Sequence, residues 1–194
     1  MENISTKVGV TKTNKKMSTK VMVSLAMLAA ISIVLVAAIH FPLIPAAAFL
    51  EYDPADVPIM IGTFAFGPVA GVLLTIVVSV VQGLTVSAGG GMIGIVMHIF
   101  ATGACAFVAG TIYRRNKTRK NAVLALIAGA VVQTAAMVVM NMIFTPLFMG
   151  VSLEEVLPML VPIIIPFNLL KAGINGTMTF LLYKSISHLL KGNA

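Results

Sequence analysis

The chain has 194 residues, of which 59% are hydrophobic and only 10% are charged. Soluble domains are about 45 to 50% apolar, so this composition excludes a soluble enzyme and predicts one integral membrane domain over residues 1–194. The net charge of +7 does not indicate nucleic acid, because the cations flank apolar segments, where they set the orientation of membrane helices. We expect the lipid bilayer as a partner and no nucleic acid.

The basic amino end, residues 1–20, precedes an apolar run over residues 21–41. A signal-peptide core is only about 7 to 15 residues long, whereas about 20 apolar residues are needed to cross a bilayer. We therefore interpret this run as a retained first membrane helix. Ala26 and Ala30 lie about one turn apart on it, and small residues at this spacing let a second helix approach closely.

The charges alternate along the chain in a way that constrains whether the number of membrane crossings between them is odd or even. Apart from Lys171, the basic residues gather at the two ends and in residues 114–120, whereas all acidic residues but Glu2 lie at positions 51–56 and 154–155. Basic loops tend to stay in the cytoplasm, so an even number of crossings must separate neighbouring basic segments. We predict an all-α integral membrane protein: six transmembrane helices in a single bundle, with both termini and the loop 114–120 cytoplasmic.

The predicted external loop, residues 41–58, contains prolines and acidic residues around an apolar centre, AAAFL. An apolar centre suggests a lid over a binding site, and a plain external connection is the alternative. The next apolar segment, residues 57–86, must enter and leave the membrane. Thirty helical residues reach only about 45 Å, less than two crossings of a core about 30 Å thick. We therefore expect at least one short helix and a break at residues 66–68, FGP.

Three further helices are predicted over residues 92–113, 122–146 and 158–183. These helices and the segment 57–86 carry scattered polar groups. We expect most of these groups to form hydrogen bonds between helices, as polar residues in membranes commonly do; they are Ser79, His98, Thr102, Gln133 and Thr134. Gln82 is a candidate for contact with a ligand. His98 has no partner at metal-binding spacing, and Cys105, in an apolar run, is expected to be a buried small side chain.

The segment PFNLLKAGING, residues 166–176, places Lys171 near the middle of the last predicted helix, on one face with Asn168 and Asn175. An ionised lysine there costs at least about 2.5 to 3.5 kcal/mol, and no acidic residue falls within a predicted helix. Its partner should be polar amides, lid residues, water or a ligand. A cavity lined by amides and one lysine suits a flat neutral heterocycle with carbonyl and ring N–H groups.

The sequence contains neither the phosphate-binding pattern GxxxxGK[ST] nor the zinc motif HExxH. Its Ser, His and Asp residues are not placed where the predicted topology would bring them together. We therefore expect no enzymatic activity, no cofactor and no metal, and no ATP hydrolysis by the chain itself.

Two segments, YDPADVP at residues 52–58 and PFNLLK at residues 166–171, resemble the riboflavin-specific S components of energy-coupling factor (ECF) vitamin transporters. The resemblance covers nearly the whole chain. It implies a cell-membrane protein that captures riboflavin from outside. Delivery inward would need a transmembrane coupling subunit and two ATPase subunits.

The same resemblance implies roles for individual residues. Asn168 and Lys171 match the PFNLLK motif and would form hydrogen bonds to riboflavin, while Asn141 matches a family asparagine by position. Phe49 of the lid would cover the ring system. Ala26 and Ala30 match an Ala-x-x-x-Ala pattern that docks on the coupling subunit, with packing inside the bundle as the alternative.

Two other functions stay open from the sequence. The chain could serve another vitamin, such as thiamine, biotin, folate or a pantothenate-like compound. It could also be an accessory membrane subunit without a ligand pocket, in which Lys171 only joins helices.

Overall fold

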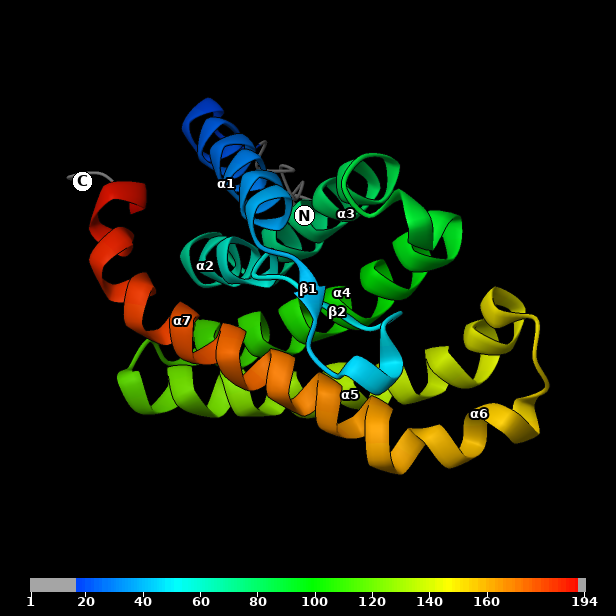
Figure 1. Cartoon of the computed structure of the whole chain (residues 1–194). Helices are drawn as coiled ribbons and strands as arrows, with labels where there is room; N and C mark the ends of the chain where they lie inside the picture. Colours follow the sequence, from blue (N-terminus) through cyan, green and yellow to red (C-terminus); the bar gives the residue numbers. More distant parts are fainter. Residues whose placement is uncertain (1–16, 192–194) are drawn as a thin grey trace, which may run out of the picture.

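The computed structural model describes residues 17–191, and this part of the chain is almost entirely helical (Figure 1). Most of the predicted basic amino end, residues 1–20, lies outside the described residues. The α-helices of the described part are α1 (Thr19–Ala38), α2 (Asp56–Phe66), α3 (Pro68–Leu84), α4 (Gly91–Arg115), α5 (Arg119–Met149), α6 (Leu153–Met159) and α7 (Ile165–Lys191).

Helices α6 and α7 form one continuous helical segment, because a π-helical turn over Leu160–Ile164 joins them. Pro158, Pro162 and Pro166 lie in and beside this turn. Each proline lacks the N–H that an α-helix would use, so regular hydrogen bonding is interrupted there. With α6 and α7 counted together, the described residues form the six helical segments that the sequence predicts.

The six segments differ in length. Within the described part of the chain, four are long and apolar enough to cross a membrane, namely Thr19–Ala38, Ala88–Arg115, Arg119–Met149 and Leu153–Tyr183. Helices α2 and α3 are shorter. Helix α2 has 11 residues and reaches only about 16 Å, roughly half of a hydrocarbon core. The expected short helix is confirmed.

The break between α2 and α3 falls at the predicted FGP sequence. Gly67 has φ 100° and ψ 175°, a conformation that residues with a Cβ rarely adopt. Pro68 then occupies the first position of α3, where its missing N–H has no cost because no helical acceptor is available there. The chain therefore reverses within one residue, which holds α2 against α3.

Helix α2 lies at the centre of the bundle, packed by α1, α3, α4 and α7 (Figure 1). Its residues from Asp56 to Phe64 are all buried. Near the end of α2, Phe64 stacks on Tyr113 of α4 with ring centroids 4.4 Å apart, and Tyr183 of α7 packs edge-on against both rings. Cys105 is buried in the same core, as predicted.

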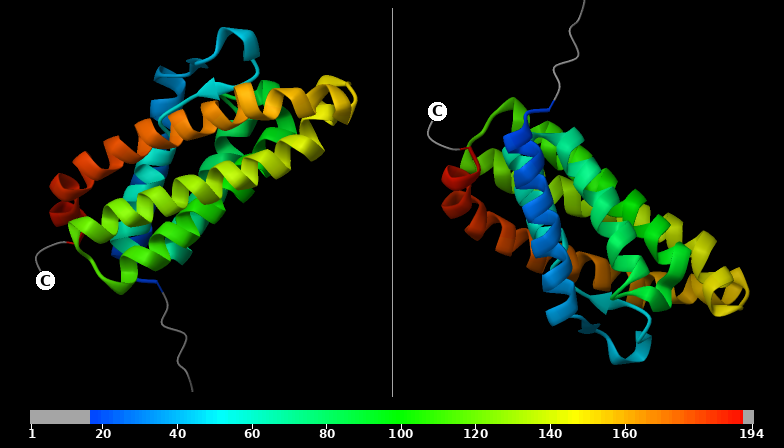
Figure 2. Two further views of the ribbon diagram at one scale, coloured as in Figure 1. Left: turned by 90° about the horizontal axis from the view of Figure 1, so that it is seen from below. Right: turned by 90° about the horizontal axis from the view of Figure 1, so that it is seen from above.

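The two ends of the bundle differ in charge. Figure 2 shows the start of α1, the α4–α5 connection and the end of α7 at one end, and the segment after α1 together with α6 at the other. The basic loop 114–120 therefore lies at the end opposite Glu51, Glu154 and Glu155. This separation agrees with the predicted topology, while the cytoplasmic placement of the termini stays a prediction.

The segment between α1 and α2 is the predicted lid. Its strands β1 (Phe41–Pro42) and β2 (Glu51–Tyr52) pair antiparallel, and a 3₁₀ turn over Pro45–Ala47 connects them. Ala47 and Leu50 are buried against the α6–α7 region in a small apolar cluster. This packing explains the apolar centre of the loop. The lid ends at Ala55, because Asp56 already belongs to α2.

Candidate functional site

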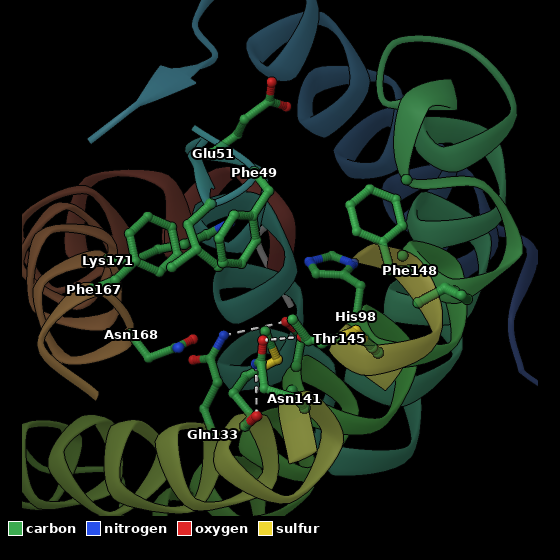
Figure 3. A pocket seen from close by; sticks show the side chains of 18 residues that line it. Phe49, Glu51, His98, Gln133, Asn141, Thr145, Phe148, Phe167, Asn168 and Lys171 are labelled. Carbon is green, nitrogen blue, oxygen red and sulfur yellow. Dashed lines mark hydrogen bonds between the residues drawn. The ribbon is translucent and has the colours of Figure 1, made fainter. Parts of the chain in front are cut away.

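A cavity of about 180 Å³ lies beneath the lid, between α4, α5 and α7 (Figure 3). Its polar lining comes from Glu51, His98, Thr102, Gln133, Asn141, Thr145, Asn168 and Lys171, and its aromatic lining from Phe49, Phe148 and Phe167. A concave, largely apolar site with a few placed polar groups is typical of a small-molecule site. A second cavity of about 410 Å³ lies between the lid, α3 and α4 and shares Phe49, Glu51, His98 and Phe148 with the first.

Four of the predicted ligand residues come together in the first cavity, namely Phe49, Asn141, Asn168 and Lys171. Gln82 does not join them and lines the second cavity instead. The Gln82 Nε2 donates to Ser87 Oγ at 3.2 Å, while its Oε1 is buried without a partner among the described residues. Gln82 is thus held by the turn after α3, outside the main cavity.

Asn141 and Asn168 are fixed in the cavity wall by their own helices. Asn141 Nδ2 donates to the Met137 carbonyl at 2.7 Å, and Asn168 Nδ2 donates to the Ile164 carbonyl at 2.8 Å. Each bond reaches back one helical turn and uses one of the two amide hydrogens. Each side chain therefore keeps a second N–H for another acceptor, already oriented by the first bond.

Lys171 is paired with an acidic residue of the lid. From the sequence alone, polar amides, lid residues, water and a ligand are all possible partners. The Lys171 Nζ lies 2.7 Å from Asp53 Oδ2 of the lid, and the two side chains are 12% and 7% exposed. Asp53 Oδ1 also accepts from the Ala55 backbone N–H at 3.0 Å. An ammonium has three hydrogens, so Lys171 can bond to Asp53 and still donate to a ligand in the cavity.

Asn175, which shares a helix face with Asn168 and Lys171, binds the lid rather than lining the main cavity. Its Nδ2 donates to the Asp53 carbonyl at 3.1 Å, and the Tyr52 hydroxyl donates to its Oδ1 at 3.0 Å. Burial and the nearby Asp53 carboxylate raise the pKa of Tyr52 above its usual 10.0. The Tyr52 phenol is therefore protonated at neutral pH, as a hydrogen-bond donor must be. Both the oxygen and the nitrogen of the Asn175 amide thus attach the lid to α7.

The expectation that no acidic residue falls within a helix of the bundle is wrong for Asp56. Asp56 was assigned to the external loop, but it lies in the first turn of α2 and is only 4% exposed. Its Oδ1 accepts from His98 Nε2 at 3.2 Å and from Thr102 Oγ1 at 3.1 Å. Its Oδ2 accepts from Gln133 Nε2 at 3.2 Å. Asp56 could not be assigned from sequence because its burial depends on how the lid folds back over the bundle.

The predicted hydrogen bonds between helices are confirmed for the groups around Asp56. Ser79 Oγ lies 2.7 Å from His98 Nδ1, which joins α3 to α4. Because Asp56 bonds to the other ring nitrogen of His98, the expectation that the topology keeps Ser, His and Asp residues apart is wrong. Gln133 joins α5 to α2 through Asp56 and to α4 through Thr102, the latter at 3.3 Å. His98 is bonded at both ring nitrogens, as expected of a core histidine, and it also lines both cavities.

Ala26 and Ala30 do not line either cavity. Both are exposed, whereas the face of α1 that packs on the bundle consists of Leu25, Leu28, Ala29, Ser32 and Val36. Packing inside the bundle, the alternative explanation for their spacing, therefore does not apply.

Comparisons with known proteins agree with this arrangement. The family model of the ECF transporter, substrate-specific component, matches residues 20–183. The riboflavin transporter RibU of Streptococcus thermophilus is 32% identical over 183 residues, which cover 89% of this chain and 85% of the relative. RibU of Staphylococcus aureus is 30% identical over 178 residues, with 89% and 93% covered.

A solved structure has a similar fold. It is described as "Structure and mechanism of the S component of a bacterial ECF transporter". The two structures superpose with a TM-score of 0.75 at 29% sequence identity, covering 89% of this chain and 98% of the other.

Proposed function

The chain belongs to the family of ECF transporter substrate-specific components, and from this premise we propose that it is the riboflavin-binding subunit of a vitamin importer. Two curated relatives, both named riboflavin transporters, support riboflavin as the cargo. As a multi-pass protein of the cell membrane, the chain captures riboflavin from outside and passes it inward with its partner subunits.

The observation that carries the proposal is the cavity beneath the lid. Asn141, Asn168 and Lys171 offer N–H donors in its wall, and a flavin ring has carbonyl and ring nitrogen acceptors that suit them. Phe49 extends from the lid over the same space (Figure 3) and covers the flat ring system. Gln82 contacts the part of the ligand that extends into the second cavity.

The charges around the cavity favour a neutral ligand. Lys171 is paired with Asp53 at 2.7 Å, so the site has no lone cation awaiting an anion. A carboxylate ligand would compete with Asp53 for the ammonium, and a cationic ligand would approach it against repulsion. Riboflavin is uncharged at neutral pH and can accept from the free N–H groups of Lys171 without displacing the lid.

The exposed alanines of α1 are the proposed contact for the coupling subunit. Ala26 and Ala30 are exposed on the face of α1 away from the bundle core, and small residues four apart let another helix approach closely. The sequence has no phosphate-binding loop, so two ATPase subunits of the assembled transporter provide the energy.

Equilibrium dialysis of the detergent-purified full chain tests the proposal. Radiolabelled riboflavin should bind saturably at one molecule per chain, and a hundredfold excess of thiamine, biotin, folate or pantothenate should leave it bound. Absence of riboflavin binding to folded protein, or displacement by one of these vitamins, would overturn the assignment.

A further inference from the structure

Gln133 is bound by its amide nitrogen alone. Its Nε2 donates to Asp56 Oδ2 at 3.2 Å and to Thr102 Oγ1 at 3.3 Å. A primary amide has two hydrogens, so both are used by these neighbours. The side chain is 8% exposed and lines the cavity beneath the lid.

The orientation of the amide is fixed by the chemistry of Asp56. An ionised carboxylate only accepts hydrogen bonds, so the group of Gln133 that faces Asp56 must be the nitrogen. The reversed amide would place two oxygens together inside the bundle. The other two neighbours of the carboxylate, His98 and Thr102, are its donors at Oδ1, and they leave Oδ2 to Gln133.

The oxygen of Gln133 is left for the cavity. Among the side chains that the structure describes, none donates a hydrogen bond to its Oε1. This oxygen is also not fully enclosed, unlike Gln82 Oε1 and Thr134 Oγ1. In Figure 3 this oxygen points toward the side of Asn168, across the floor of the cavity. Unlike Lys171, Gln133 thus presents an acceptor only.

We propose that Gln133 accepts a hydrogen bond from an N–H or O–H group of the bound ligand, and that Asp56 is the positioning residue that turns its oxygen into the cavity. The proposal rests on the proposed function, since it concerns the ligand of the same cavity. Riboflavin carries one imide N–H on its ring and hydroxyl groups on its side chain. An analogue without a donor at this point would leave a buried acceptor unsatisfied.

Hydrogen bonding between helices does not by itself explain why a glutamine occupies position 133. Hydrogen bonds from Gln133 to α2 and α4 use only its nitrogen, and a donor side chain without an oxygen would serve that purpose equally well. What requires a glutamine is the combination of two donors for the bundle and one acceptor for the cavity.

Replacing Gln133 with methionine keeps a side chain of similar length and removes the acceptor. We expect Gln133→Met to bind riboflavin about tenfold more weakly in equilibrium dialysis. Thr134→Val is the matched control, because the neighbouring Thr134 Oγ1 is buried without a partner among the described residues and does not line the cavity. It should bind riboflavin like the wild type.

A third variant distinguishes loss of the Gln133 acceptor from loss of a hydrogen bond to Asp56. Thr102→Val removes one donor from Asp56 and one acceptor from the Gln133 nitrogen. Asp56 still holds that nitrogen and leaves the Gln133 oxygen in place, so the loss of affinity should be smaller than that of Gln133→Met. The melting temperature of each ligand-free variant reports whether the bundle is intact. An equal or larger loss for Thr102→Val would overturn the proposal, because the effect would then come from Asp56 alone.

The positioning role of Asp56 is tested by a double variant. In Asp56→Asn the new amide can donate toward Gln133, which would turn the Gln133 nitrogen to the cavity and remove the acceptor. In the double variant, the fold-losses of riboflavin affinity caused by Asp56→Asn and by Gln133→Met should therefore not multiply. Multiplying losses, or a Gln133→Met affinity within twofold of the wild type, would contradict the proposal.

Lumiflavin, which lacks the hydroxylated side chain, identifies the donor. An equal Gln133→Met loss for lumiflavin and riboflavin assigns the bond to the ring N–H, and a loss confined to riboflavin assigns it to a hydroxyl group; either result supports the proposal. Failure of the proposed function is distinguishable, because the wild type would then bind no flavin at all.

Discussion

Lys171 of α7 and Asp53 of the lid form an ion pair of 2.7 Å between residues 118 positions apart in the chain. The pair gives the membrane-embedded ammonium a counter-charge and at the same time attaches the lid to the wall of the cavity. The charge of Lys171 and the closure of the site are therefore one structural feature.

The first prediction concerns the stability of this pair. Removing one partner of a buried ion pair costs about 3 kcal/mol or more, so Asp53→Asn and Lys171→Met should each lower the melting temperature of the ligand-free protein. The double variant leaves neither charge unpaired and should be more stable than the sum of the single losses implies. Fully additive losses, measured by thermal unfolding in detergent, would show that the two groups do not interact.

The second prediction concerns ligand binding by α7. A hydrogen bond to a charged donor contributes about 1.5 to 3 kcal/mol, so Lys171→Ala combined with Asn168→Ala should weaken riboflavin binding by at least about tenfold. Thr177→Ala is the control, since Thr177 is an exposed residue of the same helix whose hydroxyl donates to the Gly173 carbonyl one turn earlier. Unchanged affinity in the double variant would remove these residues from the site.

The third prediction concerns the lid. Tyr52→Phe removes the hydroxyl that donates to Asn175, and a neutral hydrogen bond contributes about 1 kcal/mol. Riboflavin should therefore dissociate about fivefold faster from the variant, as measured by stopped-flow fluorescence after dilution. A dissociation rate equal to that of the wild type would indicate that the lid does not limit ligand release.

The same bond gives the fourth prediction, on pH. The pKa of Tyr52 is raised above 10.0, first by burial and then by the Asp53 carboxylate. For a group with a raised pKa in the folded state, the stabilisation is complete below the unfolded pKa and is lost as pH rises through the folded one. The Tyr52→Phe effect on dissociation should therefore be constant from pH 7 to about pH 9; a decline within this range would contradict the assignment.

The fifth prediction concerns the partner surface. Ala26→Leu with Ala30→Leu should leave riboflavin binding intact but prevent co-purification with the coupling subunit, because larger side chains block close helix approach. Ala135→Leu, the same type of enlargement at one exposed position of α5, should still co-purify. Retention of the complex by the double variant would place the contact elsewhere.

Much of the fold could be predicted from local signals. The break at Gly67 and Pro68 follows from the conformations that glycine and proline prefer, and the shared face of Asn168, Lys171 and Asn175 follows from helical periodicity. The short α2 follows from the length of the apolar segment compared with the bilayer. Each signal lies within the segment whose structure it determines.

The burial of Asp53 and Asp56 beside the site could not be predicted from local signals. Asp53 and Asp56 occur in a proline-rich loop in the sequence, and nothing local shows that the loop folds inward. Their burial arises from contacts across the chain, with Lys171, Asn175 and Gln133. That Gln82 lines the second cavity rather than the first could not be predicted either, because its bond to Ser87 depends on the turn after α3.

Native mass spectrometry of the purified protein after incubation with an equimolar mixture of riboflavin, thiamine, biotin, folate and pantothenate tests the central claim most directly. The account predicts one added mass per chain, equal to that of riboflavin, and its loss in the variant that combines Asn168→Ala with Lys171→Ala. A folded protein that carries no added mass, or the mass of another vitamin, would contradict it.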